Sequence, residues 1–179
     1  MTSRFVLPVG DDVDLVLRER WTADAMLRLA VANIERLRAW EPWAQGEQTL
    51  AALIAYDRLQ MLDWVDGRAV PTVIRYRGEI VGTVSARIDN YQRTAELGYW
   101  IDAGAEGRGL MTASAAVLRD HVVSAYGVAR IEIRAAVQNR RSRAVAERLG
   151  FVHEGTLRSV LPVGDTRHDL AIYGYLPPS

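Results

Sequence analysis

A glycine-rich turn that joins a strand-like run to a helical pattern is the most constraining feature of this sequence. Apolar residues fill most of positions 95–101, the turn is Gly107-Arg108-Gly109, and an alanine-rich helical pattern follows at once. The first N–H groups of a helix have no intrahelical partner, and the helix dipole is positive at that end. The turn therefore predicts a phosphate or pyrophosphate site, although glycines at such a junction also serve simply as turn and packing residues.

Two well-known phosphate motifs do not fit this turn. A Walker-type loop needs Gly-Lys-Ser/Thr, and the sequence contains no lysine. A dinucleotide fingerprint needs a third glycine or alanine three residues after the second, where Thr112 stands. That fingerprint also opens a parallel strand–helix–strand unit, whereas this segment follows a pattern typical of antiparallel hairpins.

Composition excludes several classes of function. The 179 residues suffice for one domain, which we predict to span residues 1–179. The 22 basic and 22 acidic side chains balance, which disfavours a nucleic-acid partner. No cysteine is present, and His121, His153 and His168 lack the spacing of metal ligands, so we expect no metal.

The sequence also lacks a pattern typical of membrane insertion. No run approaches the roughly 20 apolar residues that a membrane span requires. Residues 1–8 lack the basic and long apolar regions of a signal peptide. We therefore expect no membrane partner and a cytoplasmic location.

Periodicity predicts a mixed α/β (α+β) protein, with one sheet flanked by helices. Short connections between three central strands predict an antiparallel meander. The predicted order is a strand at 13–19, helices at 22–40 and 49–64, strands at 72–76, 80–88 and 95–101, a helix at 109–126, a strand at 131–137, a helix at 141–149, and strands at 151–161 and 167–176.

Several segments in this order resemble the GCN5-related N-acetyltransferases (GNAT). Besides the glycine-rich turn, the resemblance rests on residues 139–151, which read NRRSRAVAERLGF. Residues 95–101, residues 37–43 with two tryptophans, and residues 151–155 followed by Arg158 are similar to the branch that acetylates N-termini of ribosomal proteins. The resemblance covers most of the chain and implies the GNAT acyl-CoA acyltransferase fold, with acetyl-CoA as co-substrate.

The resemblance implies that acetyl-CoA binds at the glycine-rich turn, where the family pattern is Gln/Arg-x-x-Gly-x-Gly/Ala. Gly107 and Gly109 match the small positions, whereas Gly104 stands at the Gln/Arg position, which would contribute mainly its backbone. Arg108 could meet a phosphate or point to solvent, and Thr112 could add a hydroxyl donor or only begin the helix. The implied diphosphate contacts are Gly104, Gly107, Arg108, Gly109, Leu110, Met111 and Thr112.

The same resemblance implies a place for the pantetheine arm. The strand before the turn would separate from its neighbour, so that backbone groups of Tyr99, Trp100 and Ile101 bond the arm as if it were another strand. Asn139 would hold the arm from the other side. An asparagine after a strand is also a common helix cap or turn residue.

Acetyl transfer from a thioester to an amine needs a neutral amine, a stabilised oxyanion and a proton for the leaving thiolate. By resemblance, Glu96 is the candidate base, acting through water. The alternative is a glutamate that only faces solvent. Glu132 and Glu154 are weaker rivals.

The candidate acid departs from the pattern of many acetyltransferases of this class. Their tyrosine, seven residues after the asparagine, is replaced here by Ala146. The ribosomal branch implies Ser142 instead, near the sulfur of coenzyme A, although a serine there could also cap the short helix. Tyr173 and Tyr175 are possible substitutes.

The acceptor amine is the least constrained part of the prediction. In this class the early helical region lines the acceptor groove, so Trp40 and Trp43 are candidate substrate contacts, although helical tryptophans are usually core residues. A protein N-terminus is the expected acceptor. A small-molecule amine and a non-catalytic domain that only binds coenzyme A are the alternatives, and the resemblance also allows a homodimer.

Overall fold

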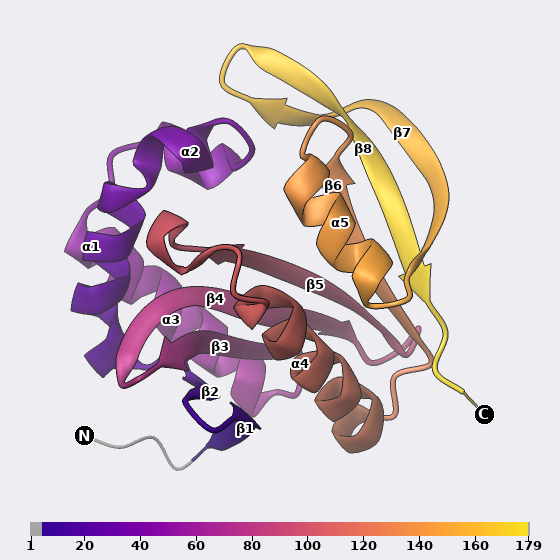
Figure 1. Cartoon of the computed structure of the whole chain (residues 1–179), viewed down its shortest axis with the longest axis horizontal. Coiled ribbons are helices and arrows are strands. Elements are labelled where there is room, and N and C mark those ends of the chain that lie inside the picture. Colours follow the sequence, from indigo (N-terminus) through magenta and orange to yellow (C-terminus); the bar gives the residue numbers. More distant parts are fainter. Residues whose placement is uncertain (1–4, 179) are drawn as a thin grey trace.

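An eight-stranded sheet runs through the molecule, with helices packed on both of its faces (Figure 1). The computed structural model describes residues 5–178, so residues 1–4 and 179 of the predicted range 1–179 lie outside the described residues. The strands are β1 (Val6–Gly10), β2 (Val13–Leu17), β3 (Ala69–Tyr76), β4 (Glu79–Asp89), β5 (Thr94–Ile101), β6 (Arg130–Ala136), β7 (Val152–Val163) and β8 (Thr166–Tyr175). The helices are α1 (Ala23–Ala32), α2 (Ile34–Arg38), α3 (Leu50–Val65), α4 (Leu110–Tyr126) and α5 (Arg140–Arg148), with short 3₁₀ segments η1 (Arg20–Thr22), η2 (Pro42–Gln45) and η3 (Ala103–Ala105).

The sheet divides in its middle, between β5 and β6. Its order is β1-β2-β3-β4-β5-β6-β8-β7, and β5–β6 is the parallel pair, connected through α4. This pair extends only from Thr94↔Arg130 to Leu97↔Ile133. Beyond Leu97, β5 stays paired with β4 as far as Ile101, while β6 stays paired with β8. The facing edges of β5 and β6 therefore separate and open a gap in the sheet.

Two groups of helices cover the two faces. Helices α1 and α3 pack on β4 and β3, and α4 packs on β4, β5 and β1 from the opposite face. The larger core lies under α4, whose Leu118 and Val122 are fully buried against Leu97 and Ile133. The stripe that helical spacing predicts for α4 is half right: Leu110, Leu118 and Val122 are buried, whereas Ala113 and Ala125 are exposed.

The mixed α/β fold predicted from periodicity is confirmed, with two differences at the N-terminal end. The sequence did not predict β1, because a five-residue edge strand that contains Pro8 and is largely exposed carries little pattern. The helix predicted at 22–40 is broken at Asn33, whose φ of −108° and ψ of 9° end α1. The buried Asn33 side chain donates to Leu29 O and Asp102 Oδ1 and accepts from the Ala103 N–H, so it ties this break to the loop after β5.

Helix α3 faces the sheet with only half-buried apolar residues, and its one buried side chain is Asp57. The Asp57 carboxylate pairs with Arg18 Nε at 2.5 Å, and its Oδ2 has no hydrogen-bond partner among the described residues. Burial raises the pKa of Asp57, and the Arg18 charge opposes this rise. Arg18 and Asp57 thus form a buried ion pair in which each side chain provides the counter-charge of the other.

Removal of either side chain of this ion pair should therefore destabilise the fold. We expect Asp57→Ala to lower the free energy of unfolding by about 3 kcal/mol, because it leaves Arg18 buried without its carboxylate. Urea denaturation measures the change. The matched control is Asp63→Ala, which breaks an exposed pair with Arg68 and should cost less than about 1 kcal/mol. Equal losses in the two variants would contradict a special role for the buried pair.

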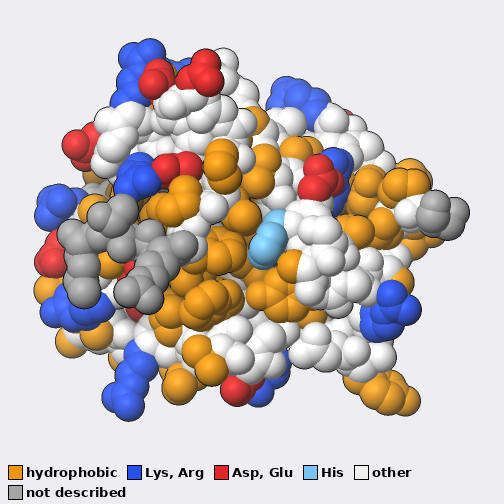
Figure 2. All heavy atoms as spheres, turned by 90° about the horizontal axis from the view of Figure 1, so that it is seen from below, with side chains coloured by type: hydrophobic (Ala, Val, Ile, Leu, Met, Phe, Trp, Pro, Cys, Tyr) orange, Lys and Arg blue, Asp and Glu red, His pale blue; other side chains and the backbone are white. Residues whose placement is uncertain are grey.

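The underside of the molecule, formed by β1, α3 and α4, carries hydrophobic side chains gathered around a histidine (Figure 2). The rings of Phe5, Trp64, His121 and Tyr126, from the start of the chain, α3 and α4, contact one another, with 5.5 Å between the Phe5 and His121 centroids. Burial lowers the pKa of His121, which is consistent with a packing role for its imidazole ring.

In the part of the chain described, no helix is long and apolar enough to cross a membrane.

Candidate active site

Two cavities meet where β5 separates from β6. The larger cavity, of about 1600 Å³, lies between the glycine-rich turn and α5. The smaller cavity, of about 680 Å³, lies between α1, α3 and the opposite face of the sheet. The residues that line both cavities are Trp40, Glu41, Tyr99, Trp100, Asn139 and Ser142.

The glycine-rich turn presents the expected set of free donors to the larger cavity. Gly107 and Gly109 have φ of +75° and +74°, a region that favours glycine, and an added Cβ at either would meet no described atom within 4 Å. None of the backbone N–H groups of residues 107–112 donates to another described residue. The cavity is lined here by Gly107, Gly109, Leu110, Met111 and Thr112. This arrangement fits a diphosphate.

Two residues expected at the diphosphate lie elsewhere. The Gly104 N–H donates to Asp102 Oδ2 at 3.1 Å, so it is already satisfied within the loop. The Arg108 guanidinium lies over the Tyr76 ring, 5.9 Å from its centroid. Neither Gly104 nor Arg108 lines either cavity, because the loop bends them toward its own backbone and toward β3.

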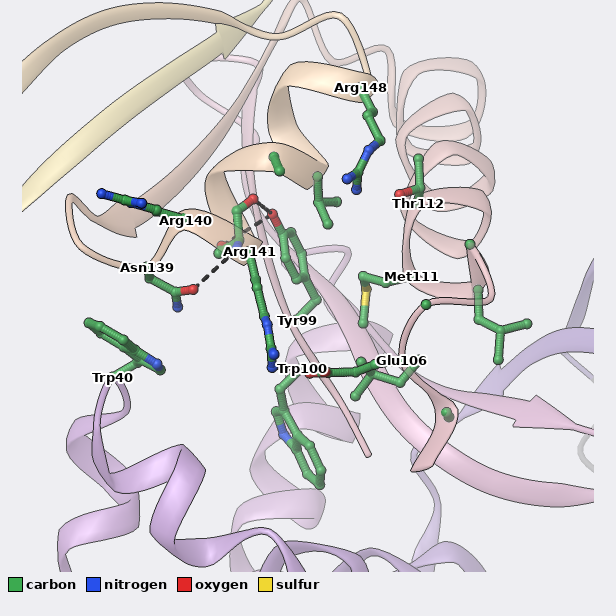
Figure 3. Close-up of a pocket in the computed structure, with 18 of the residues that line it drawn as sticks. Trp40, Tyr99, Trp100, Glu106, Met111, Thr112, Asn139, Arg140, Arg141 and Arg148 are labelled. Atoms are coloured by element: carbon green, nitrogen blue, oxygen red, sulfur yellow. Dashed lines mark hydrogen bonds and ion pairs between the residues drawn. The ribbon is translucent and has the colours of Figure 1, made fainter. Parts of the chain in front are cut away.

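Arginines of α4 and α5 line the larger cavity, which Arg108 does not reach. Arg119 of α4 and Arg140, Arg141 and Arg148 of α5 line the larger cavity, and Figure 3 shows Arg148 across from Thr112. Three of them, Arg140, Arg141 and Arg148, stand in the segment 139–151, but nothing local in that segment indicates that they face a cavity. Arg141 pairs with Glu106 of the turn at 2.8 Å, and Arg36 also pairs with Glu106. These pairs compensate the one carboxylate beside the free N–H groups.

The gap between β5 and β6 has the form expected for an extended arm. Tyr99, Trp100 and Ile101 line the larger cavity along the edge of β5 that no longer pairs with β6. Asn139 begins α5 on the other side, and its Oδ1 accepts a 3.1 Å hydrogen bond from the Ser142 N–H. Asn139 is therefore the helix cap, while its Nδ2 has no partner among the described residues.

Two hydroxyl groups face each other at the junction of the cavities. Ser142 Oγ donates to Tyr99 Oη at 3.3 Å, and Tyr99 Oη donates to the Ser142 carbonyl oxygen at 2.9 Å. Burial raises the pKa of Tyr99 to about 12, so its hydroxyl stays protonated. The family resemblance implied a role only for the backbone of Tyr99, not for its hydroxyl. Strand alternation places the Tyr99 side chain on the opposite face of β5 from those of Glu96 and Trp100, and this alternation could have indicated a separate role for the Tyr99 hydroxyl.

The substitute tyrosines do not reach this junction. Tyr173 is buried, and its hydroxyl accepts from Arg143 Nε at 2.8 Å and donates to Glu147 Oε1 at 3.0 Å. Tyr175 packs against Phe151, with 5.3 Å between ring centroids. Neither tyrosine lines either cavity.

Glu96 lies in the smaller cavity, but its charge is already compensated. It pairs with Arg87 at 2.9 Å and with Arg134 at 3.6 Å. The rivals Glu132 and Glu154 line neither cavity. Burial acts to raise the pKa of Glu132, but hydrogen bonds from Arg134 and Arg130 outweigh it and lower that pKa. The hydrogen bond from Arg130 lowers the pKa of Glu154.

The tryptophans expected at the acceptor groove do lie beside the smaller cavity. Trp40 lines both cavities, and its ring is 6.0 Å from that of His168. Trp43 lines the smaller cavity, with its ring 6.2 Å from that of Trp100.

Among the described side chains, no three His, Asp or Glu residues are placed to hold a metal ion.

Glu41 is a carboxylate at the junction that sequence analysis did not identify. It is half-buried and lines both cavities. Its Oε2 accepts a 2.9 Å hydrogen bond from Trp43 Nε1. Burial raises the pKa of Glu41, and the bond from Trp43 opposes this rise. The signal was its position between the two tryptophans of residues 37–43, directly before Pro42.

Comparison with known proteins agrees with the resemblance seen in the sequence. The family model described as the acetyltransferase (GNAT) domain matches residues 14–152. YdaF of Bacillus subtilis (strain 168), assigned as a ribosomal N-acetyltransferase, is 32% identical over 177 residues, which cover 96% of this chain and 95% of YdaF.

Two solved structures of acetyltransferases with bound coenzyme share the fold. RimL, a ribosomal L7/L12 alpha-N-protein acetyltransferase in complex with coenzyme A, gives a TM-score of 0.93 at 25% identity, over 96% of this chain and 98% of RimL. The microcin C7 self-immunity acetyltransferase MccE, in complex with acetyl-CoA and AMP, gives 0.90 at 26% identity, over 94% of each chain. The chain therefore belongs to the GNAT acetyltransferase family, and its activity is acetyl-CoA-dependent N-acetyl transfer.

Proposed function

We propose that the acceptor is the α-amino group of a protein N-terminus, and specifically that of a ribosomal protein. The acetyl group passes directly from acetyl-CoA to this amine in a ternary complex. The observation that carries this proposal is the pair of cavities that meet at Tyr99 and Ser142 from opposite faces of the sheet. YdaF and RimL, which match nearly the whole chain, carry names of ribosomal N-acetyltransferases. An N-terminus can enter the smaller cavity as an extended chain end.

The donor side of the reaction uses the larger cavity. The free N–H groups of residues 107–112 bind the diphosphate of acetyl-CoA, and arginines of α4 and α5 add charge. The edge of β5 at residues 99–101 and the free Nδ2 of Asn139 hold the pantetheine arm. Acetyl-CoA supplies the thioester, whose carbonyl carbon is open to the amine at the junction.

The chemistry at the junction needs few groups. An α-amino group has a pKa near 8 and is partly neutral at pH 7. Backbone N–H groups of β5 stabilise the negative charge that develops on the carbonyl oxygen. Ser142 gives its hydroxyl proton to the leaving sulfur, and Tyr99, hydrogen-bonded to Ser142, keeps that hydroxyl in place. Glu96, between its two arginines, orients the acceptor chain.

Peptide acetylation tests the acceptor. We expect transfer from acetyl-CoA to synthetic peptides that copy ribosomal-protein N-termini, measured as thiol release together with the added mass of one acetyl group. The control is the same peptides with a formylated α-amine and an internal lysine, which should not react. Reaction only with polyamines or other small amines would contradict a protein N-terminus as acceptor, and thiol release without product would contradict transfer to an amine.

A further inference from the structure

We propose that the Glu41 carboxylate binds the ammonium group of the acceptor and removes its proton before attack on the thioester. This assignment rests on the proposed function, since it concerns the amine that enters the smaller cavity. It adds a catalytic residue from the early helical region to the hydroxyl pair of Tyr99 and Ser142.

The first reason is position. Glutamates that line either cavity are Glu41, Glu47, Glu96 and Glu106, and Glu41 alone among them lines both. Like Ser142 and Tyr99, it lies on the boundary that the two cavities share, where we propose that the thioester and the amine meet. Glu106 lies at the diphosphate end, and Glu96 lines only the smaller cavity.

The second reason is charge. Glu96 has Arg87 and Arg134, and Glu106 has Arg36 and Arg141. Glu41 is half-buried and forms no ion pair with any described arginine or histidine; the one described donor to its carboxylate is the neutral Trp43 indole. A carboxylate withdrawn from water without a counter-charge is stabilised when a cation enters beside it. An ammonium group is such a cation.

The third reason is the aromatic lining around the carboxylate. Trp40 and Trp43 flank Glu41 in sequence, and the Trp43 ring lies 6.2 Å from that of Trp100. All three indoles line the smaller cavity. Indole faces attract cations, so carboxylate and rings together favour an amine and disfavour an anionic group at this end of the acceptor.

The backbone fixes the carboxylate in this place. The Glu41 N–H donates to Leu37 O at 2.8 Å, and the Glu41 carbonyl accepts from the Ala44 N–H at 3.1 Å. Its φ of −111° and ψ of 114° are those that a residue before proline prefers, and Pro42 begins η2. The side chain therefore extends from a rigid joint between α2 and η2.

The proton balance of the step is simple. Glu41 takes one proton from the ammonium group, the freed lone pair forms the N–C bond, and the C–S bond breaks as Ser142 protonates the sulfur. Burial raises the pKa of Glu41 toward that of the amine, which makes the transfer easier. As the tetrahedral intermediate collapses, its nitrogen gives up a second proton, which restores the Ser142 hydroxyl through water; Glu41 returns the first proton to water, so one proton is released per amide formed.

Glu41→Gln tests the assignment, because glutamine keeps the shape and an acceptor for the Trp43 bond but cannot hold a cation or a proton. We expect kcat/KM for an α-amino peptide to fall about 10²-fold, with the Kd of acetyl-CoA changed less than twofold. The matched control Glu35→Gln removes an exposed carboxylate from α2 that lines neither cavity, and it should leave the rate unchanged.

A second acceptor separates this chemistry from a structural effect. A peptide that ends in an aminooxyacetyl group carries a nucleophile that is already neutral at pH 7, so Glu41→Gln should slow its acetylation far less than that of the α-amino peptide. Equal losses with both acceptors, or no loss with either, would overturn the assignment while leaving peptide acetylation by the unmodified protein intact. If Glu41→Gln does not fold, the same comparison with Glu41→Asp, which keeps the charge but shortens the reach, decides the question.

Discussion

Ser142→Ala is expected to lower kcat about 10²-fold, because the leaving sulfur loses its proton donor. The Kd of acetyl-CoA should change less than twofold, since we assign the diphosphate contacts to residues 107–112 and the Asn139 cap bonds the Ser142 N–H, which alanine retains. Steady-state rates with a peptide acceptor give kcat, and calorimetry with acetyl-CoA gives the Kd.

Two variants make this result specific. Ser124→Ala removes an exposed hydroxyl of α4 that bonds only the His121 carbonyl, and it should leave kcat unchanged. Tyr99→Phe removes the hydroxyl that faces Ser142 Oγ and should cause a smaller loss than Ser142→Ala. A full rate for Ser142→Ala, or a larger loss for Tyr99→Phe, would remove Ser142 from its role as the acid.

Gly109→Ala is expected to weaken acetyl-CoA binding about 10-fold or more. Gly109 has φ of +74°, so alanine there costs about 1 kcal/mol or more in backbone strain and turns the N–H groups of the turn away from one another. The added Cβ also projects into space that no described atom fills and that we assign to the diphosphate. Each charge-assisted hydrogen bond lost is worth about 1.5–3 kcal/mol.

The same helix offers the control for this substitution. Gly127 ends α4 with φ of +61° and lines neither cavity. Gly127→Ala should therefore cost a similar free energy of unfolding but leave the Kd of acetyl-CoA unchanged. Equal weakening of acetyl-CoA binding in both variants would mean that strain in α4, and not the loss of the N–H cradle, causes the effect.

Local patterns predict much of the fold because they report directly on burial. The alternation predicted at residues 131–137 places Ile131 and Ile133 in the larger core, and helical spacing in α4 does so for Leu118 and Val122. The break at Asn33 and the edge strand β1 were not predicted. Asn33 is buried by contacts with Asp102 and Ala103, about 70 positions away along the chain, and no local pattern reports such contacts. The edge strand is stabilised by pairing with β2 and not by its own sequence.

The candidate site also has a part that local sequence patterns predict and a part that depends on distant contacts. The backbone cradle at Gly107 and Gly109 can be predicted from glycines between a strand and a helix, since positive φ is a local property. Which carboxylate is free to act depends on neighbours from other elements. Glu96 is compensated by arginines of β4 and β6, whereas Glu41 has no such partner among residues 5–178. The absence of a counter-charge has no signature in the sequence.

A crystal structure with coenzyme A and an acceptor peptide tests most directly whether the two substrates meet through the divided sheet. The predicted result places the diphosphate on the N–H groups of residues 107–112, the sulfur beside Ser142 Oγ, and the peptide amine in the smaller cavity next to Glu41. A sulfur far from Ser142, or a peptide bound on the same side of the sheet as the diphosphate, would contradict it.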